Sequence, residues 1–374
     1  MDNKYIGANI PKLGFGLMRL PMIGNEVDLE QTKAMTDLFM EKGFTYFDTA
    51  YPYINGKSEI AAKEFLVKRF PRDSFQLASK MPVWMCKQYE DFQPLFDLQL
   101  DRTGATYFDF YLLHGLDKDR IVQMDEIGGW DFVKAMKEKG LIKHFGFSFH
   151  DTADVLDQIL TAHPEAEFVQ LQINYADWND DNVQSRLCYE VARKHHTPVI
   201  IMEPVKGGNL AAMTPTIQGL FKEVQPDMSI ASWAIRYAAS LEGVITVLSG
   251  MSTIDQLEDN VSFMADFTPL SDSEHGVIAN VINELSKVET IPCTSCKYCV
   301  DDCPSKINIP EVLNTYNTYK TYHDLNGGKG HYKWVTSNGG KASDCIACGL
   351  CEGHCPQHIR IIDALAEIAN LFES

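Results

Sequence analysis

Two short runs of cysteine constrain the end of this chain more than any other feature of its sequence. Each run has the spacing C-x2-C-x2-C-x3-C-P, and residues 304–344 separate the two. Such spacing lets several thiolates converge on one small metal core, and two copies of the pattern are typical of a pair of [4Fe–4S] clusters. The predicted cluster ligands are Cys293, Cys296, Cys299, Cys303, Cys345, Cys348, Cys351 and Cys355.

The fourth cysteine of each run is expected to bind the other cluster, because the following proline turns the chain away from its own cluster. Zinc is the alternative, since C-x2-C pairs also build zinc ribbons. A four-ligand zinc site, however, has no use for the third closely spaced cysteine or for the Cys-Pro ending. Cys86 and Cys188 lie outside the runs and are interpreted as core or surface residues. The predicted ligand sets are Cys293, Cys296, Cys299 and Cys355 for one cluster, and Cys345, Cys348, Cys351 and Cys303 for the other.

The first 285 residues alternate short apolar segments with amphipathic ones. Helix-like stretches lie between the apolar segments, and Gly43 and Gly140 stand where helices would end. Eight strands alternating with helices over about 250 residues predict an α/β fold, the (β/α)8 TIM barrel. The predicted strands are residues 12–18, 44–50, 74–80, 108–114, 144–150, 168–174, 198–204 and 243–250.

Composition limits where this chain works and what it binds. Its formal net charge is −18 at pH 7, and such a surface repels phosphate backbones and anionic lipids, so we expect no nucleic acid and no membrane as partners. No apolar run approaches 18 residues and no targeting segment is apparent, which predicts a cytoplasmic protein. The length suits one large domain plus a small one. We expect the barrel over residues 1–288 and a small, mainly helical ferredoxin-like domain over residues 289–374.

Four reactive residues follow three consecutive predicted strands, at the carboxyl ends where barrels carry their active sites. Asp48 lies near the end of the second strand, with Tyr53 five residues later, while Lys80 ends the third strand and His114 the fourth. Each residue alone has a structural interpretation, as a satisfied histidine, a solvated lysine or a loop tyrosine. Together on one rim they indicate a catalytic site.

The same residues carry a resemblance to the aldo-keto reductases. "FDTAYPYINGKSE", "SK" at 79–80, "YLLHG" and "GFS" at 146–148 match that family's order and spacing across residues 5–285. The resemblance implies that Asp48, Tyr53, Lys80 and His114 form a catalytic tetrad. A free tyrosine titrates near ~10, so an ammonium beside Tyr53 is expected to lower its pKa, while Asp48 keeps Lys80 charged. Tyr53 would protonate a carbonyl oxygen that His114 orients.

Hydride reduction requires a nicotinamide, and the resemblance implies NADP or NAD bound in extended form across the barrel mouth. In this match Ser148 and Gln170 hold the carboxamide, and Met202 stands where an aromatic residue often stacks on the ring. Relatives that depend on NADPH tend to have Lys-Ser and then Arg after the eighth strand, where this chain has Gly250-Met251 and then Gln256. The choice between NADP and NAD is therefore open. The implied nucleotide contacts are Ser148, Gln170, Met202, Glu203, Val205, Gly207, Gly250, Gln256 and Asn260.

Two further segments leave alternatives open. Arg19, after the first predicted strand, is expected either to meet an anionic substrate or to pair with a barrel carboxylate. The glycine-rich residues 326–341 between the cysteine runs are interpreted as a tolerated surface insertion, or as a loop that reaches the barrel mouth or a partner.

Over its full length the chain resembles the ferredoxin-fused subgroup of aldo-keto reductases. The leading hypothesis is an NAD(P)H-dependent oxidoreductase that reduces an aldehyde, a ketone or a related small molecule, with two [4Fe–4S] clusters for electron transfer. One alternative is an electron-transfer protein that couples nicotinamide to a ferredoxin or flavoprotein partner. Another is a nucleotide-binding redox sensor, but a pure binder has no need of Lys80 beside Tyr53.

Overall fold

The computed structural model describes every residue except 1–5, 182 and 301. The described chain forms two compact units, residues 1–207 with 231–272 and residues 208–230 with 273–374. The predicted domain boundary at residue 288 stays a prediction. None of the described helices is both long and apolar enough to span a bilayer.

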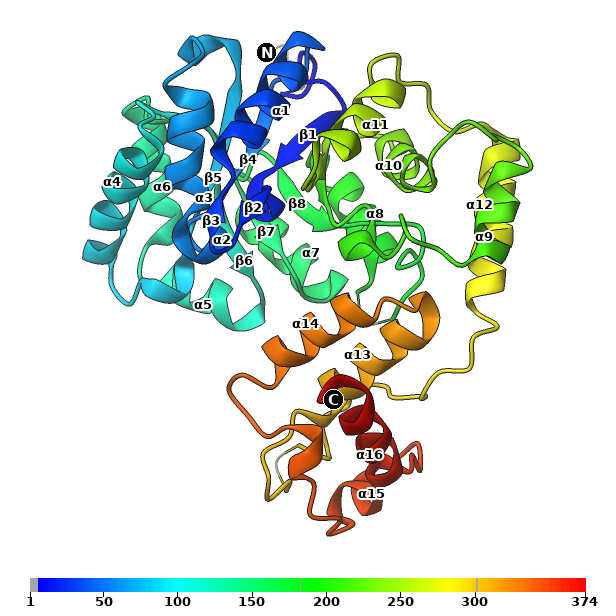
Figure 1. Cartoon of the computed structure of the whole chain (residues 1–374). Helices are drawn as coiled ribbons and strands as arrows, with labels where there is room; N and C mark the ends of the chain where they lie inside the picture. The colour runs from blue at the N-terminus through cyan, green and yellow to red at the C-terminus, as the bar shows by residue number, and fades with distance from the viewer. Residues whose placement is uncertain (1–5, 182, 301) are drawn as a thin grey trace. The chain divides into compact units, whose positions relative to one another are not determined.

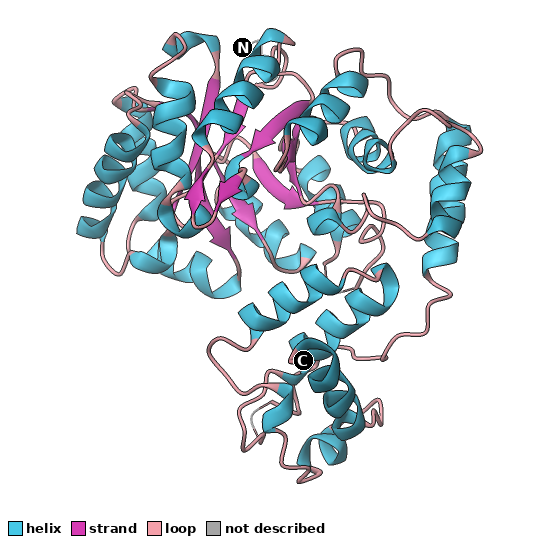
Figure 2. Ribbon diagram, in the orientation of Figure 1, coloured by secondary structure: helices cyan, strands magenta, loops and turns pink. Residues whose placement is uncertain are grey.

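Eight parallel strands close into a barrel in the first unit, drawn as the magenta arrows of Figure 2. Each strand pairs with its neighbours in the order β1-β10-β9-β8-β7-β6-β5-β4, and each of the eight predicted segments overlaps one of them. The predicted (β/α)8 barrel is therefore confirmed. The strands are β1 (Leu13–Gly16), β4 (Tyr46–Asp48), β5 (Gln76–Met81), β6 (Phe108–Leu116), β7 (Ile142–Phe149), β8 (Val169–Gln172), β9 (Val199–Met202) and β10 (Val244–Ser249).

Helices connect the strands and surround the barrel (Figure 1). The first begins at Asp28, whose carboxylate accepts a hydrogen bond from the Gln31 amide at 3.0 Å, and it buries Met35 and Phe39. A two-stranded antiparallel sheet of β2 (Met22–Ile23) and β3 (Glu26–Val27) precedes it. The helices of this unit are α1 (Leu29–Glu41), α2 (Tyr53–Gly56), α3 (Ser58–Ala62), α4 (Phe92–Thr103), α5 (Lys118–Glu126), α6 (Gly129–Glu138), α7 (Ala153–Ala162), α8 (Ser185–Lys194), α10 (Ile230–Ser240) and α11 (Ile254–Met264).

Side chains fill the barrel interior and fix how its strands approach each other. The ring of Phe110 meets Tyr46 at 5.1 Å and Phe168 at 5.2 Å between centroids. At Gly146 a Cβ atom would lie 2.1 Å from the carbonyl oxygen of Phe168, so only glycine allows β7 and β8 to pair here. The resulting register sets Ser148, near the carboxyl end of β7, opposite Gln170 in β8.

The second unit is helical around one apolar core. Much of the stretch interpreted as an insertion or loop, residues 326–341, instead belongs to the helix Leu325–Val335, whose Tyr332 is buried. The phenol of Tyr332 donates to Glu373 at 2.5 Å and accepts from the Ala342 amide at 2.7 Å, so this segment belongs to the core. The helices of this unit are α9 (Pro215–Lys222), α12 (Asp272–Leu285), α13 (Ile309–Tyr322), α14 (Leu325–Val335), α15 (Leu350–His354) and α16 (Ile361–Phe372).

Candidate functional site

A cavity of about 280 Å³ lies at the carboxyl ends of the barrel strands. All four members of the predicted tetrad line it, as do five of the nine predicted nucleotide contacts. Its lining residues are Gly16, Met18, Arg19, Asp48, Tyr53, Lys80, His114, Ser148, His150, Gln170, Met202, Glu203, Leu248 and Gly250.

A buried ion pair lies on one wall of this cavity. Lys80 on β5 is fully buried, and its ammonium donates to the Asp48 carboxylate on β4 at 2.6 Å and to the Thr49 carbonyl at 2.8 Å. Burial by itself would lower the pKa of Lys80, but the negative charge of Asp48 and the contact with Tyr53 raise the pKa above its ordinary value. The structure therefore holds a charged lysine where no solvent reaches it.

The Lys80 ammonium lies 4.8 Å from the centre of the Tyr53 ring. Its charge and its hydrogen bond act to lower the pKa of Tyr53, as the sequence predicted, but burial acts more strongly and the net pKa is raised. The expected net decrease is wrong for this state of the site, because the cost of burying a phenolate exceeds the stabilisation by one paired ammonium. Tyr53 is therefore a protonated phenol at neutral pH, which is the form that a proton donor needs.

His114 faces Tyr53 across the cavity, with 6.0 Å between the ring centroids, and Trp84 covers its other side at 5.2 Å. Burial, together with the nearby charges of Lys80 and Arg120, lowers the pKa of His114 well below its ordinary value. The imidazole is therefore neutral at pH 7. Its buried Nδ1 atom has no hydrogen-bond partner among the described residues.

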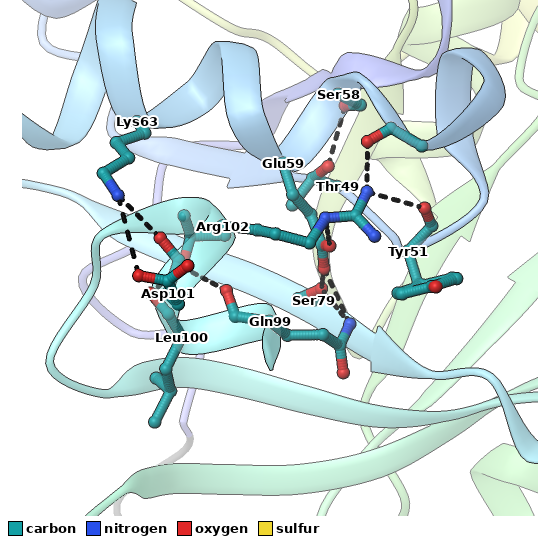
Figure 3. Close-up of polar contacts among 12 residues, drawn as sticks. Thr49, Tyr51, Ser58, Glu59, Lys63, Ser79, Gln99, Leu100, Asp101 and Arg102 are labelled. Atoms are coloured by element: carbon teal, nitrogen blue, oxygen red, sulfur yellow. Dashed lines mark hydrogen bonds and ion pairs between the residues drawn. The ribbon is translucent and has the colours of Figure 1, made fainter. Parts of the chain in front are cut away.

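The loop that carries Tyr53 has an unusual backbone. Ile54 and Asn55 both adopt left-handed conformations, with φ of 53° and 52°, which is costly for a β-branched residue such as isoleucine. Arg102 on α4 binds this loop. Its guanidinium donates to the carbonyl oxygens of Tyr51 and Gly56, and its Cζ atom lies 4.3 Å from the centre of the Tyr51 ring (Figure 3). These contacts offset the strain and fix the direction of Tyr53.

A buried carboxylate anchors Arg102 in turn. Glu59 is fully buried and meets the Arg102 guanidinium at 3.1 Å, while its other oxygen accepts from Ser79 and Gln99 at 2.7 Å each (Figure 3). Gln99 also donates to the carbonyl oxygen of Lys80 at 3.0 Å. The network thus ties the Tyr53 loop to the strand that carries Lys80. The sequence analysis missed Glu59 and Arg102. The only sequence feature that could have indicated them is the presence of two opposite charges in segments that must pack against the barrel.

The predicted nucleotide contacts divide into two groups. Ser148, Gln170, Met202, Glu203 and Gly250 line the cavity. The Oε1 atom of Gln170 is buried without a hydrogen-bond partner, whereas its amide nitrogen contacts the Met202 sulfur at 3.6 Å. An unpartnered buried acceptor suits the carboxamide of a nicotinamide, so these residues fit the cofactor.

The other four predicted contacts, Val205, Gly207, Gln256 and Asn260, do not line the cavity. Gln256 is exposed and accepts a hydrogen bond from the Ser252 amide at 2.7 Å. Asn260 is buried and donates to Ser249 at 2.8 Å. Their roles toward a nucleotide stay predictions.

The eight cysteines of the second unit surround two separate cavities. The first is lined by three cysteines of the first run and the last cysteine of the second run, and the other is lined by the remaining four. Ile309, at the start of α13, lines both cavities. Four thiols around an apolar space are the donor set of a [4Fe–4S] cluster, so the residues fit that group. The two sets are Cys293, Cys296, Cys299 and Cys355, and Cys303, Cys345, Cys348 and Cys351.

Comparisons with known proteins agree with this division. Residues 12–283 match the aldo/keto reductase family and residues 292–359 match a 4Fe-4S dicluster domain. An aldo-keto reductase of Gibberella moniliformis is 27% identical over 152 residues, which span less than half of that protein. An uncharacterised oxidoreductase of Schizosaccharomyces pombe is 24% identical over 67% of this chain and 81% of its own length. The crystal structure of a Klebsiella pneumoniae aldo-keto reductase in complex with NADPH matches 73% of this chain and 91% of its own, with 19% identity and a TM-score of 0.58.

The crossed arrangement of the cysteines makes a prediction about single ligands. Cys303→Ala is expected to damage the cluster built on residues 345–351 and to leave the cluster built on residues 293–299 comparatively intact, because Cys303 lines only the former cavity. EPR or Mössbauer spectra of the anaerobically purified variant test this, with Cys299→Ala and Cys351→Ala as references. If Cys303→Ala and Cys299→Ala leave the same surviving spectrum, each run binds its own cluster.

A second prediction follows from the neutral state of His114. Its pKa is lowered in the folded protein, so below about pH 6.5 the unfolded chain takes up a proton that the folded chain does not. The free energy of unfolding should therefore fall as the pH drops from 7 to 5. One proton taken up only by the unfolded chain lowers it by at most ~1.4 kcal/mol per pH unit, so His114 should account for about 1–2 kcal/mol of the decrease. In His114→Asn this part of the decrease is expected to disappear.

Denaturant unfolding followed by tryptophan fluorescence at pH 7, 6 and 5 measures the effect. His196→Asn, at an exposed position just after α8 whose left-handed backbone asparagine tolerates, is the matched control for the same substitution outside the cavity. An unchanged pH dependence in His114→Asn would mean that this histidine carries its proton in the folded state.

Proposed function

Because this chain belongs to the aldo/keto reductase family and carries a 4Fe-4S dicluster domain, we propose that it reduces the carbonyl group of an aldehyde, ketone or related small molecule with NADPH or NADH. The observation that carries the proposal is the buried Lys80–Asp48 pair beside Tyr53, in a cavity that also holds His114 and the unpartnered Gln170 amide oxygen.

Each residue of the tetrad has its own role in the proposed reduction. A bound nicotinamide would supply hydride to the carbonyl carbon. The phenol of Tyr53 gives its proton to the carbonyl oxygen, which completes the alcohol, and the Lys80 ammonium stabilises the phenolate until solvent restores the proton. The neutral His114 donates a hydrogen bond to the same oxygen and orients it. Asp48 keeps Lys80 charged and fixed in place.

This division makes Tyr53 the proton donor and not an anchor for the nucleotide. Tyr53→Phe is expected to lower kcat for carbonyl reduction by about 10²–10⁴, the usual worth of general acid catalysis, while the Kd for NADPH changes little. Steady-state kinetics and a nucleotide titration on the same preparation measure both. Wild-type kcat in the phenylalanine variant with any accepted carbonyl would overturn the tetrad assignment.

A second candidate function rests on the two four-cysteine cavities. Two clusters could pass single electrons between a nicotinamide and a ferredoxin or flavoprotein partner. A nicotinamide gives up two electrons at once as hydride, whereas a [4Fe–4S] cluster accepts one.

We therefore expect that NADPH or NADH alone, added anaerobically, leaves the visible absorbance and EPR signal of the oxidised clusters unchanged, while a test aldehyde is turned over. Dithionite is the positive control, since it reduces clusters directly. Bleaching by the nucleotide without aldehyde turnover would favour the electron-transfer function instead.

A further inference from the structure

Arg19 is a cation in the cavity that the reaction described above does not use. It ends the short helical turn after β1, is exposed, and lines the cavity together with Lys80 and Tyr53. Its Nη2 atom lies 3.5 Å from the position that a Cβ atom on Gly207 would take, and its methylene groups lie 3.3–3.4 Å from the corresponding position on Gly250. The side chain therefore extends from the end of β1 across the residues that follow β10 and β9.

The guanidinium of Arg19 is not committed to a partner within the described part of the chain. The Arg19 carbonyl oxygen accepts from Ser252 at 2.8 Å, but the guanidinium makes no hydrogen bond or ion pair among the described residues. Lys206 follows β9, but it is committed to Asp177 by an ion pair. Lys80 is committed to Asp48.

Two acidic side chains line the cavity together with Arg19. Asp48 and Glu203 line the same cavity, and the Glu203 carboxylate is fixed by the Gly207 amide at 2.6 Å. The chain as a whole has a net charge of −18. Because Lys80 neutralises Asp48, Glu203 is the carboxylate that repels an anionic ligand in this cavity, and such a ligand needs a cation that is free to bind it.

The strand order divides the residues of the cavity into two groups. Tyr53 follows β4 and Lys80 and His114 lie on β5 and β6, while the run β8, β9, β10 and β1 leads from Gln170 to Arg19. The first run is the catalytic half of the cavity. The second run holds the unpartnered Gln170 oxygen that suits the carboxamide, so it is the cofactor half. β1 pairs with both β10 and β4, and Arg19 belongs to the cofactor half because its side chain lies against Gly250 and Gly207, which follow β10 and β9.

The volume of the cavity indicates which phosphate of the cofactor lies beside Arg19. A volume of about 280 Å³ cannot enclose a whole dinucleotide. The group beside Arg19 must therefore be close to the nicotinamide ring along the cofactor. The pyrophosphate follows the ring after one ribose, whereas the 2′-phosphate of NADP lies on the far adenosine.

We propose that Arg19 binds the pyrophosphate of the nicotinamide cofactor through its guanidinium. The glycine at position 250 leaves the space for this, because a Cβ atom there would lie only 3.3–3.4 Å from the methylene groups of Arg19. The proposed contact is therefore with a group that NADPH and NADH share, and it leaves the choice between the two nucleotides open. This inference rests on the proposed function, since it names a residue that holds the cofactor of that reaction.

The test is a binding measurement that needs no turnover. Isothermal titration of NADPH and of NADH into anaerobically purified full-length protein gives the Kd for wild type, Arg19→Gln, Arg19→Lys and Arg186→Gln. Arg186 lies on α8 outside the cavity, where it pairs with Glu190, and serves as the matched control. Melting curves check that each variant is folded.

Arg19→Gln is expected to weaken NADPH and NADH alike, by about tenfold or more, because a hydrogen bond between charged groups is lost. Arg19→Lys should lose less, since lysine keeps the charge without the two-pronged geometry. Arg186→Gln should bind as wild type does. Equal loss for both dinucleotides identifies the phosphates they share.

Four results would overturn the proposal. Weakened binding of NADPH alone would assign Arg19 to the 2′-phosphate. Unchanged Kd values with a raised KM only for carbonyl substrates that bear a carboxylate would assign it to the substrate. If Arg19→Gln binds both dinucleotides as wild type does, Arg19 does not bind the cofactor, and the proposed function still stands. If wild type binds neither dinucleotide, the proposed function fails, and the role of Arg19 fails with it.

Discussion

The buried ion pair between Lys80 and Asp48 is the interaction on which the chemistry of this barrel depends. A lysine without solvent contact stays charged only if a carboxylate lies against it, and β4 and β5 are adjacent strands that bring the two within 2.6 Å. Loss of one partner of such a pair typically costs about 3–5 kcal/mol. The pair also sets the properties of its neighbours, because the Lys80 charge opposes the effect of burial on Tyr53 and adds to the effect of burial on His114. In the proposed reduction, Tyr53 is thereby left as the proton donor to the substrate oxygen and His114 as the neutral ring that orients this oxygen.

A second set of buried charges supports the first. The left-handed Ile54 and Asn55 would not persist in an isolated loop, and Arg102 stabilises them by binding the carbonyl oxygens on either side. Arg102 needs Glu59, which is itself held by Ser79 on the same strand as Lys80. The strain beside Tyr53 is therefore carried by a network that also fixes the lysine, so the distance between ammonium and phenol does not depend on a mobile loop.

The sequence predicted what depends on spacing and missed what depends on packing. Strand periodicity predicted the barrel, and the position of residues at strand ends predicted that Asp48, Tyr53, Lys80 and His114 would share one cavity. The Glu59–Arg102 contact joins residues 43 positions apart through the packing of α3 on α4, which no local pattern reports. The net pKa of Tyr53 depends on how completely the ring is buried, a quantity that packing alone decides. Glycine-rich α14 is a similar case: a Cβ atom at Gly328 would lie 2.9 Å from the Phe372 ring, so glycine there serves the contact with α16.

The groups that the proposed reduction needs all lie in the first unit. Tyr53, Lys80 and His114 follow or end β4, β5 and β6, while Gln170 and Arg19 belong to the run from β8 to β1. Hydride moves two electrons in one step, and a [4Fe–4S] cluster accepts one, so nothing in carbonyl reduction by this cavity requires an electron from the cysteine-lined sites. The two chemistries can therefore proceed independently, and any coupling between them must pass through a species able to divide an electron pair.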